Sequence, residues 1–204
     1  MSELKGNAQS TGSATVALHH KAEENLQYIR ELMERSSSFT GVSGKGYVIA
    51  GVSALVTCWL AARQQSADSW LLVWMVELLF AGCLMFTLTL SKANRLGESL
   101  WSTTGKKLLF AFIPPMAMGG VLTVFLAQQA AIEWLPGIWL GLYGTAVMAA
   151  GTYSVGIIRL MGALFLMLGA AVLLLELPGN LFLGLGMGGL HIVVGGLIWS
   201  SHGG

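Results

Sequence analysis

Two ionisable side chains, Glu77 and His191, lie deep inside long apolar segments of a chain of 204 residues. A charge held in lipid is costly, so an ionisable group at such depth marks a candidate functional site. A carboxyl group and an imidazole are both common proton-transfer groups. We therefore take Glu77 and His191 as a candidate ion or proton site.

Three interpretations of this pair remain open from the sequence. In the first, the two groups are structural: they bond to each other, or each bonds separately to a Ser, Thr or Tyr such as Tyr143. In the second, they bind a proton or a cation. In the third, they form a catalytic acid–base pair. No HExxH, GxSxG or CxxC motif supports catalysis, so we expect the protein not to be an enzyme.

Cofactors and metals are not expected either. A membrane b-type haem usually needs two histidines within the spans, and only His191 of the four histidines lies in one. Cys58 and Cys83 fall inside apolar segments without ligand-like spacing, which is typical of small packing residues. The net charge of +1 gives no basis for binding nucleic acid.

The composition predicts an integral membrane protein. Hydrophobic residues make up 54% of the chain and charged residues only 10%, against about 25% charged in a typical soluble domain. A helix needs about 20 mostly apolar residues to cross the hydrocarbon core, and six segments of the chain have about this length and composition. They lack the period-two alternation of a membrane barrel. We therefore expect an all-α bundle of six transmembrane helices, at 46–64, 70–90, 108–128, 134–153, 156–176 and 179–200.

Lysine and arginine are distributed unevenly between the two sides that six spans create. One side holds Lys5, Lys21, Arg30, Arg35, Lys45, Lys92, Arg95, Lys106, Lys107 and Arg159. The other holds Arg63 beside the acidic Asp68, Glu133 and Glu176. Because basic loops stay in the cytoplasm, we expect both termini there. The chain looks like a small bacterial multi-span protein, so we expect it in the lipid bilayer of the bacterial inner (plasma) membrane.

The polar N-terminal part is expected to lie outside the bilayer. Residues 1–16 are predicted to be a disordered tail, 17–45 a cytoplasmic amphipathic helix and hinge, and 46–204 the membrane domain. The apolar face of the helix consists of Ala22, Leu26, Ile29 and Met33, spaced 4-3-4. Residues 21–35 carry three basic and four acidic side chains, whereas helices that bind anionic lipid are basic. We therefore expect residues 17–35 to contact the bundle, a second copy or a partner membrane protein.

Glycine stripes indicate how the spans pack. The fourth predicted span carries Gly137, Gly141 and Gly144, and the sixth carries Gly184, Gly188 and Gly195 on the same stripe as His191. Small residues at this period let helix backbones approach closely, either within one bundle or between copies.

Two prolines, Pro114 and Pro115, fall inside the third predicted span. A proline within a helix removes a backbone hydrogen bond, so we expect a kink there.

These features favour a non-enzymatic membrane protein. A small transporter, or a channel-like binder of an ion or small solute, would require a polar, water-accessible cavity that contains Glu77. The alternative is a non-catalytic structural or partner subunit of a larger membrane complex, with a dry, glycine-packed interior.

Overall fold

The computed structural model describes residues 20, 21, 23–29, 39–97 and 99–202, and these are helical or lie in short connections, without a strand. The chain divides into two units, residues 1–37 and 38–204. In the first unit, residues 20, 21 and 23–29 are helical. The rest of the predicted amphipathic helix, including Ala22 and Met33, lies outside the described residues, as does the predicted tail.

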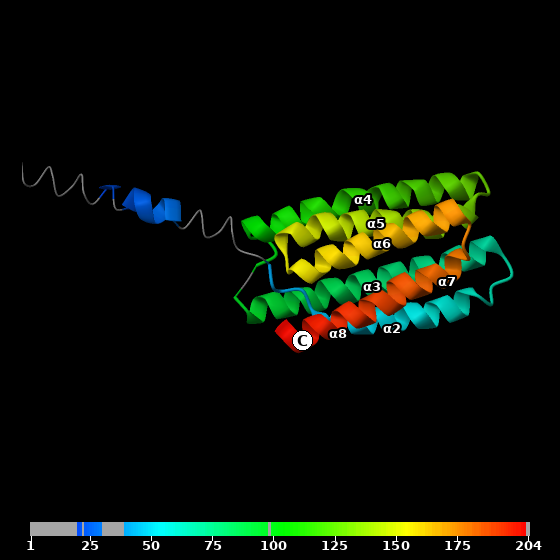
Figure 1. Ribbon diagram of the computed structural model, residues 1–204, viewed down its shortest axis with the longest axis horizontal. Coiled ribbons are helices and arrows are strands. Elements are labelled where there is room, and N and C mark those ends of the chain that lie inside the picture. Colours follow the sequence, from blue (N-terminus) through cyan, green and yellow to red (C-terminus); the bar gives the residue numbers. More distant parts are fainter. Residues whose placement is uncertain (1–19, 22, 30–38, 98, 203–204) are drawn as a thin grey trace, which may run out of the picture. The chain divides into compact units, whose positions relative to one another are not determined.

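The second unit is a bundle of helices that run between the same two ends (Figure 1). In chain order the elements are α2 (Gly44–Ala61), α3 (Ala67–Arg95), α4 (Thr103–Gln128), η1 (Ile132–Trp134), α5 (Leu135–Ala150), η2 (Gly151–Tyr153), α6 (Gly156–Leu175), α7 (Gly179–Leu183), η3 (Gly184–Leu190) and α8 (His191–His202). Within the described part, five helices are long and apolar enough to cross a membrane: α2, α3, α4, α6 and the continuous helix Gly179–Ser201. Their length and composition are those of a helical membrane protein.

The sequence predicted six membrane-spanning helices, and the fourth predicted span, 134–153, is the one that is not among these five. Its α-helical part, α5, has 16 residues, which rise about 24 Å at 1.5 Å per residue and fall short of the about 30 Å hydrocarbon core. The flanking residues wind as the 3₁₀ turns η1 and η2. Pro136 lies in the first turn of α5, where it fits because that turn needs no backbone donor.

The helix Gly179–Ser201 contains a wide turn in its middle. Residues Gly184–Leu190 form the π-helix η3, which connects α7 to α8. Four of these seven residues are glycines, so few side chains resist the wider winding. π-helical turns are rare and occur frequently at functional sites, and the residue that directly follows η3 is His191.

Helices α5 and α6 pack at very short range through glycines. A Cβ atom on Gly144 would lie 2.5 Å from the backbone nitrogen of Leu166, and one on Gly137 would lie 2.6 Å from Cγ of Leu173. Gly141 differs, because no atom lies within 4 Å of the position its Cβ would take. The α5–α6 contact therefore uses Gly137 and Gly144 from the predicted stripe. The backbone of Gly141 also faces α6, because a Cβ on Gly169 would lie 2.5 Å from its nitrogen, but the Cβ position of Gly141 itself is open.

The last span packs on α2 in the same way. A Cβ on Gly184 would lie 2.6 Å from Cys58 Sγ, and one on Gly195 would lie 2.6 Å from Tyr47 Cβ. Gly188 faces the side chain of Leu55 and the backbone of Gly51. The stripe of the sixth predicted span thus lies against α2 and carries His191 into the interior.

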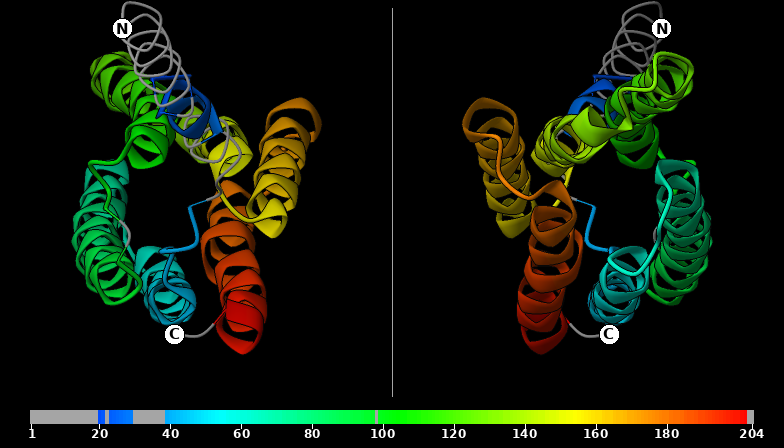
Figure 2. Two further views of the ribbon diagram at one scale, coloured as in Figure 1. Left: turned by 90° about the vertical axis from the view of Figure 1, so that its left-hand side faces the viewer. Right: turned by 90° about the vertical axis from the view of Figure 1, so that its right-hand side faces the viewer.

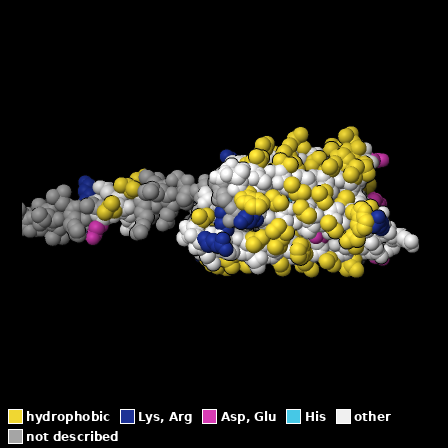
Figure 3. Space-filling model, turned by 90° about the horizontal axis from the view of Figure 1, so that it is seen from below, with side chains coloured by type: hydrophobic (Ala, Val, Ile, Leu, Met, Phe, Trp, Pro, Cys, Tyr) yellow, Lys and Arg dark blue, Asp and Glu magenta, His cyan; other side chains and the backbone are white. Residues whose placement is uncertain are grey.

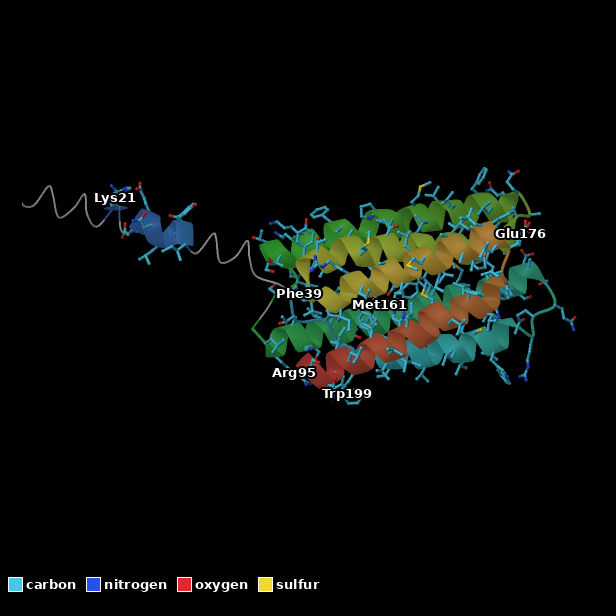
Figure 4. All side chains as sticks on the ribbon, viewed as in Figure 1. Lys21, Phe39, Arg95, Met161, Glu176 and Trp199 are labelled. Atoms are coloured by element: carbon cyan, nitrogen blue, oxygen red, sulfur yellow. The ribbon has the colours of Figure 1, made fainter. Side chains whose placement is uncertain are left out.

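Opposite ends of the bundle carry different side chains. Figure 4 places Phe39, Arg95 and Trp199 at one end and Glu176 at the other. Figure 3 shows hydrophobic side chains spread along the length of the bundle, with more of the visible Lys and Arg at one end than at the other. Such a surface, apolar along its length and charged at its ends, is suited to contact with a lipid bilayer.

Candidate functional site

A cavity of about 420 Å³ lies inside the second unit, and both Glu77 and His191 line it. In the end-on views of Figure 2 the helices are arranged around a central region. Every long helix of the unit contributes to the lining, as do α7, η3, residues that precede α2, and two residues in connections, Leu100 and Ser154. The volume falls within the range of about 300–1,000 Å³ that is usual for small-molecule sites.

Glu77 lies on α3 and is held by two hydroxyl groups of α2. Its side chain is only 8% exposed. The Ser53 hydroxyl donates to Oε1 at 2.7 Å, and the Thr57 hydroxyl donates to Oε2 at 3.1 Å. Ser53 and Thr57 are four residues apart, which puts both on one face of α2. Each oxygen of the buried carboxyl group therefore has a partner.

The bond between Ser53 and Glu77 is compatible with either charge state of the carboxyl group. Ser53 Oγ also lies 2.9 Å from the carbonyl oxygen of Ala50. A hydroxyl carries one proton and can also accept a hydrogen bond. When Ser53 donates to the Ala50 carbonyl, its oxygen can accept a hydrogen bond from the protonated carboxyl group of a neutral Glu77. The contact can thus persist while Glu77 gains or loses a proton.

His191 occupies a cage of aromatic rings from three other helices. Its Nε2 is hydrogen bonded to the hydroxyl of Tyr143 on α5 at 2.7 Å. Its ring stacks on Tyr47 of α2 at 5.3 Å between centroids and meets Phe165 of α6 edge-on at 5.4 Å. The Nδ1 atom is buried without a hydrogen-bond partner, although the backbone of Gly186 and Met187 in η3 interacts with the ring. His191 is thus oriented by packing and by one hydroxyl.

The structure brings Glu77 and His191 to one cavity, with separate hydrogen-bond partners. Those partners are Ser53 and Thr57 for the carboxyl group, and Tyr143 for the imidazole. This arrangement matches the alternative in which each group bonds separately to a hydroxyl side chain. The carboxyl group and the imidazole are therefore two separate polar groups in the lining of one cavity.

Apolar and aromatic side chains make up most of the remaining lining, so the cavity is less polar than a transporter of hydrated solutes would require. The indole N–H groups of the lining residues Trp70 and Trp74 donate away from the cavity to Asn180 Oδ1, at 2.9 and 3.1 Å. Trp139 likewise donates to Thr123 at 2.9 Å. With their polar atoms bonded elsewhere, these rings present apolar faces.

Asn180, which sequence reasoning missed, connects three elements near one end of the cavity. Its Oδ1 accepts from Trp70 and Trp74 of α3, and its Nδ2 donates to the Cys58 carbonyl of α2 at 3.1 Å. An amide offers two acceptor sites and two donors, so one side chain holds α2, α3 and α7 together. The sequence offered one signal: an amide inside the otherwise apolar start of the sixth predicted span.

At the other end, residues that precede α2 contribute to the lining. Phe39 and Val42 line the cavity and are buried. The Phe39 backbone donates to the Tyr153 carbonyl at 2.8 Å, and Ser154 Oγ donates to the Phe39 carbonyl at 2.7 Å. The Lys92 ammonium donates to the Val42 carbonyl at 3.1 Å. These bonds hold the segment across the end of the bundle.

Pro114 and Pro115 lie within α4, which continues through both from Thr103 to Gln128. Neither proline lines the cavity.

Among the described residues, no group of three or more His, Cys, Asp or Glu side chains is placed to hold a metal ion. Cys58 and Cys83 are free thiols. Comparison of the chain with protein-family models, curated proteins and solved structures gave no match.

Proposed function

We propose that this chain is a non-enzymatic membrane protein that binds a small solute in the cavity and carries it across the bilayer, as a small transporter or channel-like binder. The observation that carries the proposal is the Glu77 carboxyl group on the wall of a cavity of about 420 Å³. A subunit with a purely structural role has no need of such a space, since a packed bundle normally fills its interior.

Glu77 is the residue assigned to solute or proton binding. Its carboxyl group keeps its contact with Ser53 in either charge state, which suits a group that exchanges a proton or a cation during transport. His191 is assigned a second polar contact, positioned by Tyr143.

The proposed orientation places the end that carries Arg95, Lys106 and Lys107 in the cytoplasm of a bacterium, with the bundle in its inner membrane. Both termini then face the cytoplasm. In this arrangement α5 forms the sixth crossing, with η1 and η2 extending its 16 residues. The support for this is its course beside α4 and α6 between the two ends (Figure 1).

The proposal is tested by transport after reconstitution of the full chain into liposomes. Uptake is measured for protons and for a panel of radiolabelled small solutes, with wild type, Glu77→Gln and protein-free vesicles in parallel. We expect wild type to take up at least one of them faster than protein-free vesicles. Glu77→Gln should abolish that uptake, because it keeps the shape of the side chain and removes its ionisable group.

Glu133→Gln is the matched control, since Glu133 is an exposed carboxyl group in η1 and should not affect uptake. Far-UV circular dichroism and gel filtration confirm that each variant is folded. Uptake that is the same in wild type and folded Glu77→Gln for every solute tested would refute the proposal.

The second candidate, a non-catalytic subunit of a larger membrane complex, is favoured by one observation. In the helical residues 23–29 the side chains of Leu26 and Ile29 are 67% and 51% exposed, and these residues belong to the face predicted to contact a partner. Purification in mild detergent should then retain a partner or a second copy, and Leu26→Asp should release it. A lone monomer from wild type would contradict this candidate.

A further inference from the structure

We propose that the solute of this cavity is a lipophilic organic cation, and that it enters from the membrane between α3 and α4. The inference rests on the proposed function, because it names the solute class for the same cavity. The charge of the lining, its aromatic surface and the spacing of the helices each support it.

The charge of the lining selects for a cation. Glu77 is the one carboxylate among the described lining residues, which include no lysine or arginine. Its two hydrogen bonds come from neutral hydroxyls, and the one imidazole of the lining, that of His191, is bonded to Tyr143 instead. In a weakly polar cavity, a carboxylate attracts a positive charge and repels a negative one far more strongly than it would in water.

The aromatic surface provides further attraction for a cation. Eight Phe, Tyr and Trp side chains contribute to the lining: Phe39, Tyr47, Trp70, Trp74, Phe86, Phe112, Trp139 and Tyr143. The face of an aromatic ring carries negative electrostatic potential and attracts organic cations, most strongly when water is excluded. The tryptophan N–H groups donate to Asn180 and Thr123, so they are already bonded and the tryptophan rings offer a ligand their apolar faces.

The same lining is poorly suited to a metal cation. Calcium takes six to eight oxygen ligands, and magnesium keeps several waters in a strict octahedron. Apart from Glu77, the lining supplies only the His191 imidazole, which is bonded to Tyr143, and a few hydroxyls such as those of Thr89 and Ser154. A ligand with its own hydrocarbon shell loses little on entering such a space, because apolar surface is transferred between two apolar surroundings.

The spacing of the helices indicates the route of entry. Helix α3 packs on α2 and touches η1, but it makes no extensive contact with α4, its successor in the chain. Leu78, Gly82 and Phe86 of α3 line the cavity and are also exposed. At one end of the cavity Ser154 is hydrogen bonded to Phe39, and near the other end Asn180 is hydrogen bonded to Cys58, so both ends are connected by hydrogen bonds. The side between α3 and α4 is therefore the open approach.

The test uses two ions of the same shape and opposite charge, tetraphenylphosphonium and tetraphenylborate. Binding to the full chain in detergent is measured by equilibrium dialysis. We expect the phosphonium to bind, and the borate to bind about tenfold more weakly or worse. Glu77→Gln should lower phosphonium affinity by about tenfold or more, while Glu133→Gln should bind like wild type.

Equal binding of the two ions, or unchanged phosphonium binding in folded Glu77→Gln, would overturn the inference. Failure of the inference is distinguishable from failure of the proposed function. If Glu77-dependent uptake of another solute persists and the phosphonium does not bind, only the solute class is wrong. If no solute shows Glu77-dependent uptake or binding, both proposals fall.

The route is tested with a pair of glycines that have open space beside them. Neither Gly82 nor Gly120 has an atom within 4 Å of its Cβ position, and only Gly82 lines the cavity. Gly82→Leu should slow phosphonium association by about tenfold by filling the approach between α3 and α4. Gly120→Leu, on α4, should leave the rate unchanged. Equal association rates in both variants would refute entry at this position.

Discussion

Replacing Gly144 by leucine is expected to separate α5 from α6 and to destabilise the protein by about 3 kcal/mol or more, at the upper end of the usual cost of overpacking. The Cβ of any side chain here would lie 2.5 Å from the Leu166 nitrogen and 2.8 Å from the Gly162 carbonyl oxygen. Both are backbone atoms, so no change of rotamer relieves the collision. The helices must move apart and lose close contact along their length.

The measurement is thermal unfolding in mild detergent, followed by far-UV circular dichroism. Gly141→Leu is a sharp control, because Gly141 lies one turn earlier on the same helix with nothing within 4 Å of its Cβ position. That variant should be as stable as wild type or more so, since leucine favours a helix by up to about 1 kcal/mol over glycine. Equal destabilisation by both substitutions would show that α5 and α6 do not pack as described.

Replacing Asn180 by leucine is expected to cost about 2–4 kcal/mol. Leucine keeps approximately the size of asparagine but leaves the indole N–H groups of Trp70 and Trp74 without their acceptor. A buried donor left unpaired costs about 1–3 kcal/mol. The Cys58 carbonyl loses less, because it also accepts from the Ala62 backbone at 3.0 Å.

The readouts are thermal stability and tryptophan fluorescence, which responds to hydrogen bonding of the indole. Asn94→Leu provides the comparison, because Asn94 is exposed near the end of α3 and should change neither readout. A stability of Asn180→Leu within about 0.5 kcal/mol of wild type, the usual range for surface substitutions, would mean that the indoles find other partners. Asn180 would then not hold the three elements together.

Hydropathy predicted the positions of the long helices well and their ends less well. The second predicted span, 70–90, extends to Ala67–Arg95 because Ser66 caps its first turn and the helix continues through Lys92 and Arg95. Such polar ends lower the apolar average without ending a helix, because Arg95 is exposed at the end of α3 and the Lys92 ammonium donates to the Val42 carbonyl. The fourth span was expected at full length because its residues are apolar, but hydropathy does not distinguish 3₁₀ from α winding.

Glu77 and His191 could be selected from sequence because an ionisable residue in the middle of a long apolar segment is recognised from the composition of that segment alone. Their surroundings could not be derived, because neighbours across a bundle depend on which helices pack together. Tyr143 could be named as one candidate partner only because it is a hydroxyl residue inside an apolar span. Ser53 and Thr57 resemble many other hydroxyl residues in the chain until α2 is placed against α3.

The direction in which His191 points depends on the π-helical winding of η3, the segment that directly precedes it. The seven residues Gly184–Leu190 wind more slowly than an α-helix. If they tightened into α-helical turns, everything after them would rotate by about one residue, or about 100°. The imidazole would leave its cage, and Gly195 would turn away from α2. The winding of this short glycine-rich stretch therefore determines how α8 is rotated about its own axis.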